Sequence, residues 1–416
     1  MNTSAAATTD SPYVVVRPLA PQARIRTLDV IRGLGVLGIL IVNIQSFALP
    51  SAARSAAIAP GDDSIVNRGL WFLIHVLADG KFMAVFSLLF GAGICLISDR
   101  IEDIGMNSAP VHFRRMGFLM LVGLLHSYLL WSGDILFAYG LCGSICWFFR
   151  KSRALWLFLL GLMALMVGEC FTWIVSTSPA YNLLAVLHEV LQEVLQIPTR
   201  TTPAQELLAY RGNWMQQMTF RVPSSLDAEF ASIWIVVLWR IIGAFFIGMG
   251  LMKTRFLLGT SRRDVYRWAL LLAAAALLLA ASAGCIFVLP GSASANRLLL
   301  DFTLNYWLSI PMAAGWMTTA ILLSKLRRFA LISSGLQAVG RTAFTNYILQ
   351  TVICTTLFYG HGLGLFGSLT RSQLMLIVLI IWPFEVMASI FWLRYFQFGP
   401  IEWIQRRVSY WNRLAA

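Results

Sequence analysis

The sequence predicts an all-α, polytopic integral membrane protein, and three observations support this fold class. Of the 416 residues, 58% are hydrophobic and only 12% are charged, and the mean hydropathy is +0.72. The apolar residues form repeated runs of about 17 to 25 residues, the length that a helix needs to cross the hydrocarbon of a bilayer. The charged residues cluster between these runs. Because such a composition cannot build a water-soluble surface, the bilayer is the expected solvent.

The apolar runs predict about ten transmembrane helices in a single domain, residues 24–416. Residues 1–23 are rich in Ala, Thr, Ser and Pro, so we expect a disordered cytoplasmic tail there. Two longer connections contain the apolar stretches Ile65–Leu77 and Leu183–Gln196, which are short for spans and are expected to form helices at the outer interface. The predicted spans are residues 28–48, 81–98, 114–131, 134–150, 154–175, 229–252, 265–289, 301–325, 342–360 and 373–396.

The charge pattern predicts the orientation of the chain. There are 32 Lys and Arg against 19 Asp and Glu, a net charge of +13. With ten spans, the basic loops all fall on one side of the membrane, so the positive-inside rule places both termini in the cytoplasm. This distribution explains the basic excess without a nucleic-acid partner. The basic groups begin with Arg24, Arg26 and Arg32, continue through Arg100, Arg114 and Arg115, and end with Arg406, Arg407 and Arg413.

Ionisable residues inside spans are costly, and each is therefore a candidate for function. His126 lies about a turn and a half before the third span ends, and Asp134 follows the Ser132-Gly133 turn. A carboxylate beside an imidazole fixes its tautomer and favours its action as a general base. At 1.5 Å per residue, His126 lies roughly 8 Å below the turn, so contact requires Asp134 to dip inward. The alternative is a structural His126, bonded to a backbone group or to Tyr128.

Three further polar residues are candidates near the outer side. Asn43, at the far end of the first span, could donate to an oxyanion or bind a neighbouring helix. His75, four residues before Asp79, is a second candidate for a catalytic histidine. The remaining histidines lie in predicted loops and are expected to face solvent: His112, His188 and His361.

Buried arginine and acid residues need partners. Arg240, near the middle of the sixth span, cannot easily reach water. It must contact an acid, a group of backbone carbonyl oxygens or an anionic ligand. Glu169 and Glu385 are the candidate acids within the membrane. At the inner end of the first span, Asp29 and Arg32 are three residues apart and are expected to form an ion pair.

Five sequence motifs point together to one family. They are Leu28-Asp29-Val30-Ile31-Arg32-Gly33 leading to Asn43; Lys81-Phe82 followed by Phe86-Ser87-Leu88-Leu89-Phe90-Gly91; Gly123-Leu124-Leu125-His126 leading to Asp134; Gly340-Arg341-Thr342-Ala343 with Thr345-Asn346-Tyr347; and Phe398-Gly399-Pro400-Ile401-Glu402-Trp403. Together they resemble the YeiB family of bacterial inner-membrane proteins, over nearly the whole chain from Arg24. The resemblance implies a bacterial inner-membrane location.

The first motif is also similar, more distantly, to the opening of the transmembrane acyltransferases, such as heparan-α-glucosaminide N-acetyltransferase. Those enzymes pass an acyl group from cytoplasmic acyl-CoA to an acceptor across the membrane. The resemblance implies that Asn43 lies near the thioester and Asp79 at the entry to the second span. The active-site histidine of that enzyme lies between its first two spans, where this chain has only His75 at a different spacing. We therefore assign the general base to His126 by inference from its own surroundings.

The favoured hypothesis is acyl transfer from acetyl-CoA, or another acyl-CoA, to a hydroxyl or amine of a small-molecule or glycan acceptor. Guanidinium groups match phosphate geometry, so inner arginines would hold the CoA phosphates. The alternative use of these arginines is to set topology and bind anionic membrane lipid. The candidate CoA contacts are Arg32, Arg114, Arg115, Arg240 and Arg341.

A proton-coupled small-molecule transporter is the alternative function. There the intramembrane histidine and acids would form a proton relay, and two related halves would be expected. The sequence shows no such halves, and a non-catalytic scaffold or a homodimer also stays open. The six cysteines form no pair or cluster of metal-binding spacing, so we expect no metal site. The transporter relay would use His126, Asp134, Glu169, Arg240 and Glu385.

Overall fold

A computed structural model describes residues 25–55, 64–177, 202–229, 237–288 and 295–411, and these parts contain helices and no strand. The predicted tail 1–23 and the predicted helix Leu183–Gln196 lie outside the described residues. The helices are α1 Arg26–Ala48, α2 Ser51–Ser55, α3 Ile65–Leu77, α4 Lys81–Glu102, α5 Ala109–Leu129, α6 Leu136–Cys146, η2 Trp147–Phe149, α7 Ala154–Thr177, α9 Pro203–Arg211, α10 Trp214–Asp227, α11 Leu238–Lys253, α12 Arg263–Val288, α13 Ala295–Ser324, η4 Arg327–Phe329, α14 Ala330–Arg341, α15 Ala343–Phe358, α16 Arg371–Tyr395 and α17 Pro400–Ser409.

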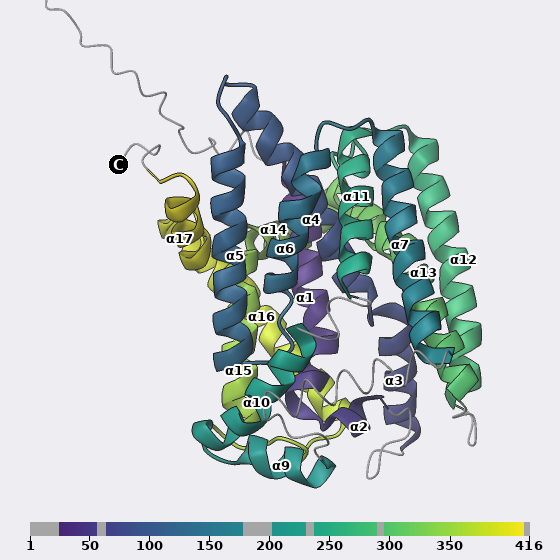
Figure 1. Cartoon of the computed structure of the whole chain (residues 1–416), viewed down its shortest axis with the longest axis vertical. Coiled ribbons are helices and arrows are strands. Elements are labelled where there is room, and N and C mark those ends of the chain that lie inside the picture. Colours follow the sequence, from purple (N-terminus) through teal and green to yellow (C-terminus); the bar gives the residue numbers. More distant parts are fainter. Residues whose placement is uncertain (1–24, 56–63, 178–201, 230–236, 289–294, 412–416) are drawn as a thin grey trace, which may run out of the picture.

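The long helices form an upright bundle around α1 (Figure 1). In the most apolar stretch of α1, 67% of residues are buried inside the protein, against 11% in the corresponding stretch of α12. α1 is therefore the central helix, and α12 lies at the periphery, where its apolar residues face outward. Such an inverted distribution, with large apolar side chains on the outside, is expected only where lipid is the solvent.

Six helices in the described parts are long and apolar enough to cross a membrane. They include the joined segment Ile65–Glu102, and two shorter apolar helices, Leu136–Phe149 and Ala343–Phe358, accompany them. Each of the ten predicted ranges coincides with a described helix; within the range 229–252, residues 230–236 lie outside the described residues, and α11 is described from Leu238. The all-α membrane fold is thus supported, while these criteria do not establish ten crossings.

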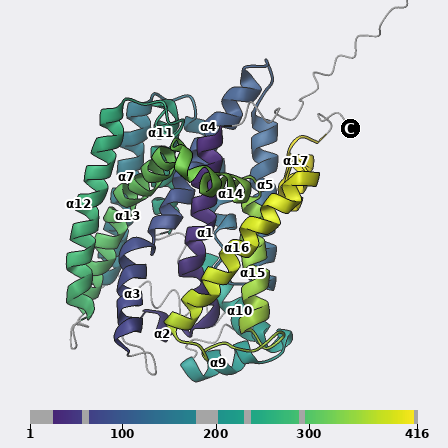
Figure 2. The ribbon, with the colours of Figure 1, turned by 180° about the vertical axis from the view of Figure 1, so that it is seen from behind.

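The bundle has two chemically different ends. We call the end at which α1 begins the basic end. α4 ends there, and three connections lie there: from α4 to α5, from η2 to α7, and from α11 to α12 (Figures 1 and 2). The opposite end, which we call the far end, is covered by α9 and α10 (Figure 1). Residues 202–229, which belong to the second of the long connections, therefore cover this end of the bundle.

The helix α3 stands upright, which differs from the predicted interfacial placement. It packs along α12 and α16, and Phe72 and Val76 approach Gly284 of α12 closely. The turn at Gly80, with φ of 74°, separates α3 from α4. The apolar face of α3 thus packs against neighbouring helices. It does not have to be buried at the membrane interface.

Two amphipathic helices at the basic end were not predicted. α14 crosses behind the bundle and packs against α1, and α17 packs against α5 (Figure 2). At the crossing, Gly33 and Gly340 face each other: a Cβ on Gly340 would overlap the carbonyl oxygen of Asp29, and a Cβ on Gly33 would overlap that of Leu336. The glycines of the first and fourth motifs therefore permit backbone contact between α1 and α14.

Glu402, from the closing motif, caps the start of α15. Its Oε1 accepts hydrogen bonds from the backbone N–H groups of Phe344 (2.7 Å) and Thr345 (3.2 Å), and its Oε2 accepts one from the Thr345 hydroxyl (2.6 Å). The first N–H groups of a helix have no partner within the helix, and a carboxylate also suits the helix dipole there. The motif thus ties α17 to α15.

We expect Glu402→Ala to lower the free energy of unfolding by about 2 kcal/mol, because it leaves these helix N–H groups without an acceptor. Thermal unfolding in detergent would measure the loss. Asp264→Ala is a suitable control, since Asp264 also lies in a first helical turn but is 58% exposed and pairs only weakly with exposed arginines. Equal midpoints for the two variants would contradict this role of Glu402.

Candidate functional site

His126 and Asp134 are in direct contact, as the inward-dipping turn requires. The Nδ1 atom of His126 lies 2.8 Å from Oδ1 of Asp134, and both side chains are almost fully buried, with 1% and 3% exposed. The Nε2 atom lies 2.9 Å from the Thr351 hydroxyl on α15. With an ionised carboxylate, which only accepts hydrogen bonds, Nδ1 carries a proton, and in the neutral imidazole Nε2 is then the acceptor that faces the Thr351 hydroxyl. This is the tautomer that a general base needs.

The turn after α5 brings the carboxylate inward. Residues 131–135 are not helical, so the chain runs back along α5 before α6 begins at Leu136. Asp134 reaches the level of Gly123, one turn deeper than His126: a Cβ on Gly123 would lie 2.8 Å from Asp134 Oδ2. That same oxygen accepts a hydrogen bond from the Phe137 N–H (3.0 Å). Each oxygen of Asp134 therefore has its own partner, which fixes the carboxylate.

Sequence reasoning missed Thr351 because it lies 225 positions from His126. The available signal was the polar series Asn346, Gln350 and Thr351, in which Asn346 and Gln350 are four residues apart on one face of a predicted span. Aromatic rings enclose the imidazole: the Tyr347 ring centroid is 5.3 Å away and that of Trp131 is 6.1 Å away. The site is thus rigid and shielded from water, conditions that strengthen electrostatic interactions.

A buried arginine fixes the end of α5 beside this site. Arg221 of α10 is 0% exposed; its Nη1 donates to the Leu129 carbonyl (2.6 Å) and its Nη2 donates to Gln217 (2.9 Å). Ser225 of the same helix donates to the Ser127 carbonyl (3.0 Å). The cover at the far end therefore holds the backbone of the last turn of α5, directly after His126.

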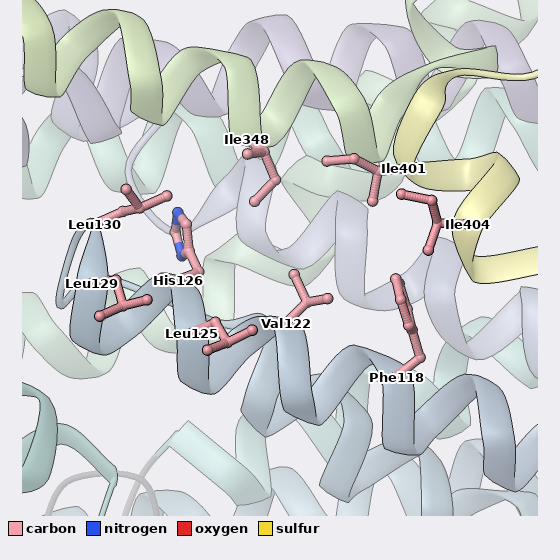
Figure 3. A pocket seen from close by; sticks show the side chains of 9 residues that line it. All are labelled: Phe118, Val122, Leu125, His126, Leu129, Leu130, Ile348, Ile401 and Ile404. Carbon is pink, nitrogen blue, oxygen red and sulfur yellow. The ribbon is translucent and has the colours of Figure 1, made fainter. Parts of the chain in front are cut away.

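An apolar groove reaches the imidazole from the side. It has a volume of about 390 Å³ and is lined by Phe118, Val122, Leu125, His126, Leu129, Leu130, Ile348, Ile401 and Ile404. Figure 3 shows the His126 ring projecting from α5 toward α15, near Leu129 and Leu130, with Phe118 and Ile404 at the other end. From Phe118 to Leu130 the helical rise is roughly 18 Å. A hydrocarbon chain of one leaflet, about 15 Å, has a similar length.

A second polar cluster lies between α3, α4 and α13. His75 Nε2 lies 3.0 Å from Asp301 Oδ1, and its Nδ1 lies 3.5 Å from Asp79 Oδ2. Lys81, 1% exposed, donates to the His75 carbonyl (2.7 Å). The structure thus brings the predicted candidates His75 and Asp79 together, and it adds Asp301 as a second carboxylate partner of His75. Asp79 remains 48% exposed, so an opening reaches this cluster.

The predicted acid partners of Arg240 are engaged elsewhere. Glu385 accepts a hydrogen bond from Gln350 (3.1 Å), and Glu169 accepts from Thr303 (2.6 Å) and Trp173 (3.0 Å). Neither forms an ion pair with Arg240, so of the three alternatives for Arg240 the direct acid partner is not the one observed. Glu385 failed as a candidate because α16 faces α1 and not α11, a fact that only the packing reveals.

Four of the five arginines predicted to hold acyl-CoA lie near the basic end. Arg32 pairs with Asp29 at 2.8 Å, as predicted, and lies close enough to Arg115 for their charges to repel. Arg114 donates to the Trp411 carbonyl (3.2 Å), and Arg341 to the Gln397 carbonyl (3.2 Å). Buried nitrogens of Arg115 (Nη1) and Arg341 (Nε) have no hydrogen-bond partner. Unsatisfied donors of this kind suit an anionic ligand.

Arg240 is not part of that group. It is the third residue of α11, thirteen residues before Lys253 at the basic end, which corresponds to roughly 20 Å along the helix. The prediction that grouped Arg240 with the CoA contacts is therefore not met. Asn43 is half-buried on α1, and no hydrogen bond joins it to His126 or Asp134.

His112 corrects another expectation. It is 2% exposed on α5, with Nε2 3.1 Å from the Gly143 carbonyl oxygen, because α5 begins five residues earlier than the predicted span. His361 is exposed, as predicted, and His188 lies outside the described residues. Within the parts of the chain that the structure describes, no three His, Cys, Asp or Glu side chains group to hold a metal ion.

Comparison with known proteins identifies relatives along nearly the whole chain. A family model described as "Protein of unknown function (DUF418)" matches residues 227–412. "Uncharacterized protein YeiB" of Escherichia coli (strain K12) is 32% identical over 408 residues, covering 92% of this chain and 95% of that protein. "Uncharacterized protein YxaH" of Bacillus subtilis (strain 168) is 27% identical over 418 residues, covering 96% of this chain and 98% of that protein. These descriptions assign no activity, so function has to be argued from the site.

Proposed function

The chain belongs to the YeiB family, and from that premise we propose that it is a transmembrane acyltransferase. It moves an acyl group, in the first instance acetyl, from cytoplasmic acyl-CoA to a hydroxyl or amine on the outer side of the bacterial inner membrane. The observation that carries the proposal is the buried chain Thr351–His126–Asp134, with separations of 2.9 and 2.8 Å. It has the arrangement of a hydroxyl, a base and a group that orients the base.

The chemistry needs one proton acceptor and one bond exchange. Nε2 of His126 takes the proton from the acceptor O–H or N–H while the oxygen or nitrogen attacks the thioester carbonyl carbon. The carbon–sulfur bond then breaks, and the imidazolium returns the proton to the departing CoA thiolate. Asp134 stabilises the imidazolium that forms between these steps. No metal or redox partner is required.

Thr351 stands at the place from which the base takes its proton. Two roles are compatible with the 2.9 Å contact: the Thr351 hydroxyl is itself acylated first, or it holds the position that the acceptor hydroxyl occupies later. Thr351→Val separates them, since Val keeps the shape and lacks the hydroxyl. Complete loss of transfer assigns the first role, and retained transfer assigns the second.

The bundle supplies a route for each reactant. The arginines Arg32, Arg115 and Arg341 at the basic end would hold the CoA phosphates, and the lateral groove would admit an apolar part of a reactant from the lipid. We place ten crossings in the membrane, with both termini in the cytoplasm, because the connections rich in Lys and Arg lie at the basic end. The reaction then crosses from the basic end to the covered far end.

Acetyl-CoA binding to detergent-purified protein, measured by calorimetry, tests this proposal. We expect wild type to bind, Arg115→Gln to bind at least about tenfold more weakly, and His126→Gln to bind normally, because His126 serves the chemistry and not the phosphates. Arg263→Gln, an exposed arginine in α12 of the same end, is the matched control and should also bind normally. The proposal is rejected if folded wild-type protein binds neither acetyl-CoA nor longer acyl-CoAs.

A proton-coupled transporter is the second candidate, and one observation favours it. His75 lies between two carboxylates, Asp79 and Asp301, in a cluster that an opening reaches. Such a group can exchange protons during transport. Proton uptake by protein in proteoliposomes that is abolished by His75→Gln and unaffected by His126→Gln would favour this function over acyl transfer.

A further inference from the structure

The guanidinium group of Arg240 is the most unusual buried charge in the described part of the chain. Its Nε and Nη2 atoms are buried and have no hydrogen-bond partner, and no carboxylate forms an ion pair with it within 4.0 Å. Arg221 and Arg371, which are more deeply buried, instead donate to carbonyl oxygens of Leu129 and Ala53. A buried donor without an acceptor is destabilising, and more so when the group is charged.

The two free atoms lie on one edge of the guanidinium. The N–H groups of Nε and Nη2 point in parallel, the arrangement with which arginine binds both oxygens of a carboxylate or phosphate. The Tyr306 ring covers one face of the group, with its centroid 5.1 Å from Cζ. The position of the group is therefore fixed, and only its edge is available.

The turn between α3 and α4 is shaped to this edge. Gly80 has φ of 74°, which favours glycine, and a Cβ there would lie 2.7 Å from Arg240 Nη2 and 2.8 Å from Asn305 Oδ1. The next residue, Lys81, is buried, and its ammonium group bonds only the His75 carbonyl among the hydrogen bonds described. A second cation without an ion pair thus lies one residue from the turn.

The nearby acids do not occupy the edge of Arg240. Asp79 and Asp301 are both directed at the ring of His75, and Glu169 bonds Thr303 and Trp173. Asp79 and Glu169 attract Arg240 only from longer range. They reduce the cost of holding the cation in the membrane and leave its bidentate edge unused.

We propose that the free edge of Arg240, at the Gly80 turn and beside Lys81, binds an oxyanion, a carboxylate or a phosphate, carried by the acceptor. This assignment of the acceptor class rests on the proposed acyl transfer. The CoA phosphates are excluded as its occupant, because Arg240 lies roughly 20 Å along α11 from the basic end. The opening that exposes Asp79 gives the oxyanion its path.

The binding of simple anions to purified protein tests the site without any need for activity. The probes are succinate for the carboxylate class and inorganic phosphate for the phosphate class, with chloride at equal ionic strength as control. We expect one probe to raise the thermal unfolding midpoint of wild type. Arg240→Lys, which keeps the charge and loses the paired N–H edge, should need at least about tenfold more of that probe for the same rise. The probe that acts decides the class.

Two further variants make the result decisive. Gly80→Ala introduces a Cβ beside Nη2 and should also weaken the effect, whereas Arg263→Gln, an exposed arginine at the basic end, should leave it unchanged. An equal midpoint rise in wild type and Arg240→Lys, or no rise with either probe in wild type, overturns the proposal. Acetyl-CoA binding, measured on the same Arg240→Lys protein, should be normal. The anion measurements thus test the oxyanion site, and the acetyl-CoA measurement tests the proposed acyl transfer separately.

Discussion

Asp134→Asn is expected to lower the rate constant of acyl transfer by about 10³- to 10⁴-fold, with acetyl-CoA binding unchanged. An amide presents an N–H group where the carboxylate accepts the His126 Nδ1 proton, so the proton moves to Nε2 and the base is lost. The fold should survive, because the remaining amide oxygen can still accept the Phe137 N–H that Asp134 Oδ2 now accepts at 3.0 Å. Single-turnover transfer from radiolabelled acetyl-CoA measures the rate constant directly.

Asp301→Asn is the matched control for this experiment. Asp301 makes the same kind of contact, 3.0 Å from a histidine ring nitrogen, in the second cluster. If His126 is the base, this variant should change the transfer rate constant by less than about tenfold. A large loss in Asp301→Asn with little loss in Asp134→Asn would transfer the catalytic role to His75 and reject the site proposed above.

Gly340→Ala is expected to destabilise the protein by about 3 kcal/mol, the upper part of the usual cost of overpacking. The added methyl would overlap the Asp29 carbonyl oxygen, a backbone atom that can move only if α1 and α14 separate. Because α1 is the central helix, such a shift disturbs the whole basic end. Fluorescence-detected thermal unfolding in detergent should show a large drop in midpoint and a smaller yield of monodisperse protein.

Gly93→Ala on α4 provides the control, since nothing lies within 4 Å of a Cβ at that position. Alanine there should be neutral or slightly stabilising, because helix interiors prefer it to glycine. Gly33→Ala, on the opposite side of the same crossing, should behave like Gly340→Ala, and the double variant should cost less than the sum of the two. Midpoints for Gly340→Ala that match those of Gly93→Ala would disprove the contact.

The relation between sequence and site is clearest for His126. The sequence placed an imidazole and a carboxylate on consecutive helices and showed that contact needs an inward turn. These are local properties, set by the helical rise and by a connection of only a few residues. The third member, Thr351, could not be identified in this way, because nothing along the chain determines which residue of α15 meets α5.

The same limit applies to the charged residues. Sequence reasoning recognised that Arg240 needs a partner, yet it could not tell an acid from a ligand, because Glu169 and Glu385 were both available. Packing directs Glu385 to Gln350 and Asp79 to His75, which leaves the edge of Arg240 free. Likewise, the importance of Asp301 for His75 depends on a contact between α3 and α13.

The sequence by itself determined that this protein is an all-helical membrane protein, where its ten long apolar segments lie along the chain, and that its basic loops gather at one end. Hydrophobic length and charge are properties of consecutive residues, and the bilayer acts on them directly. Only the tertiary structure decided that α1 is central, that α14 crosses it at two glycines, and which polar side chains meet. Those contacts depend on helix packing between distant segments, where small residues and buried hydrogen bonds select one arrangement among many.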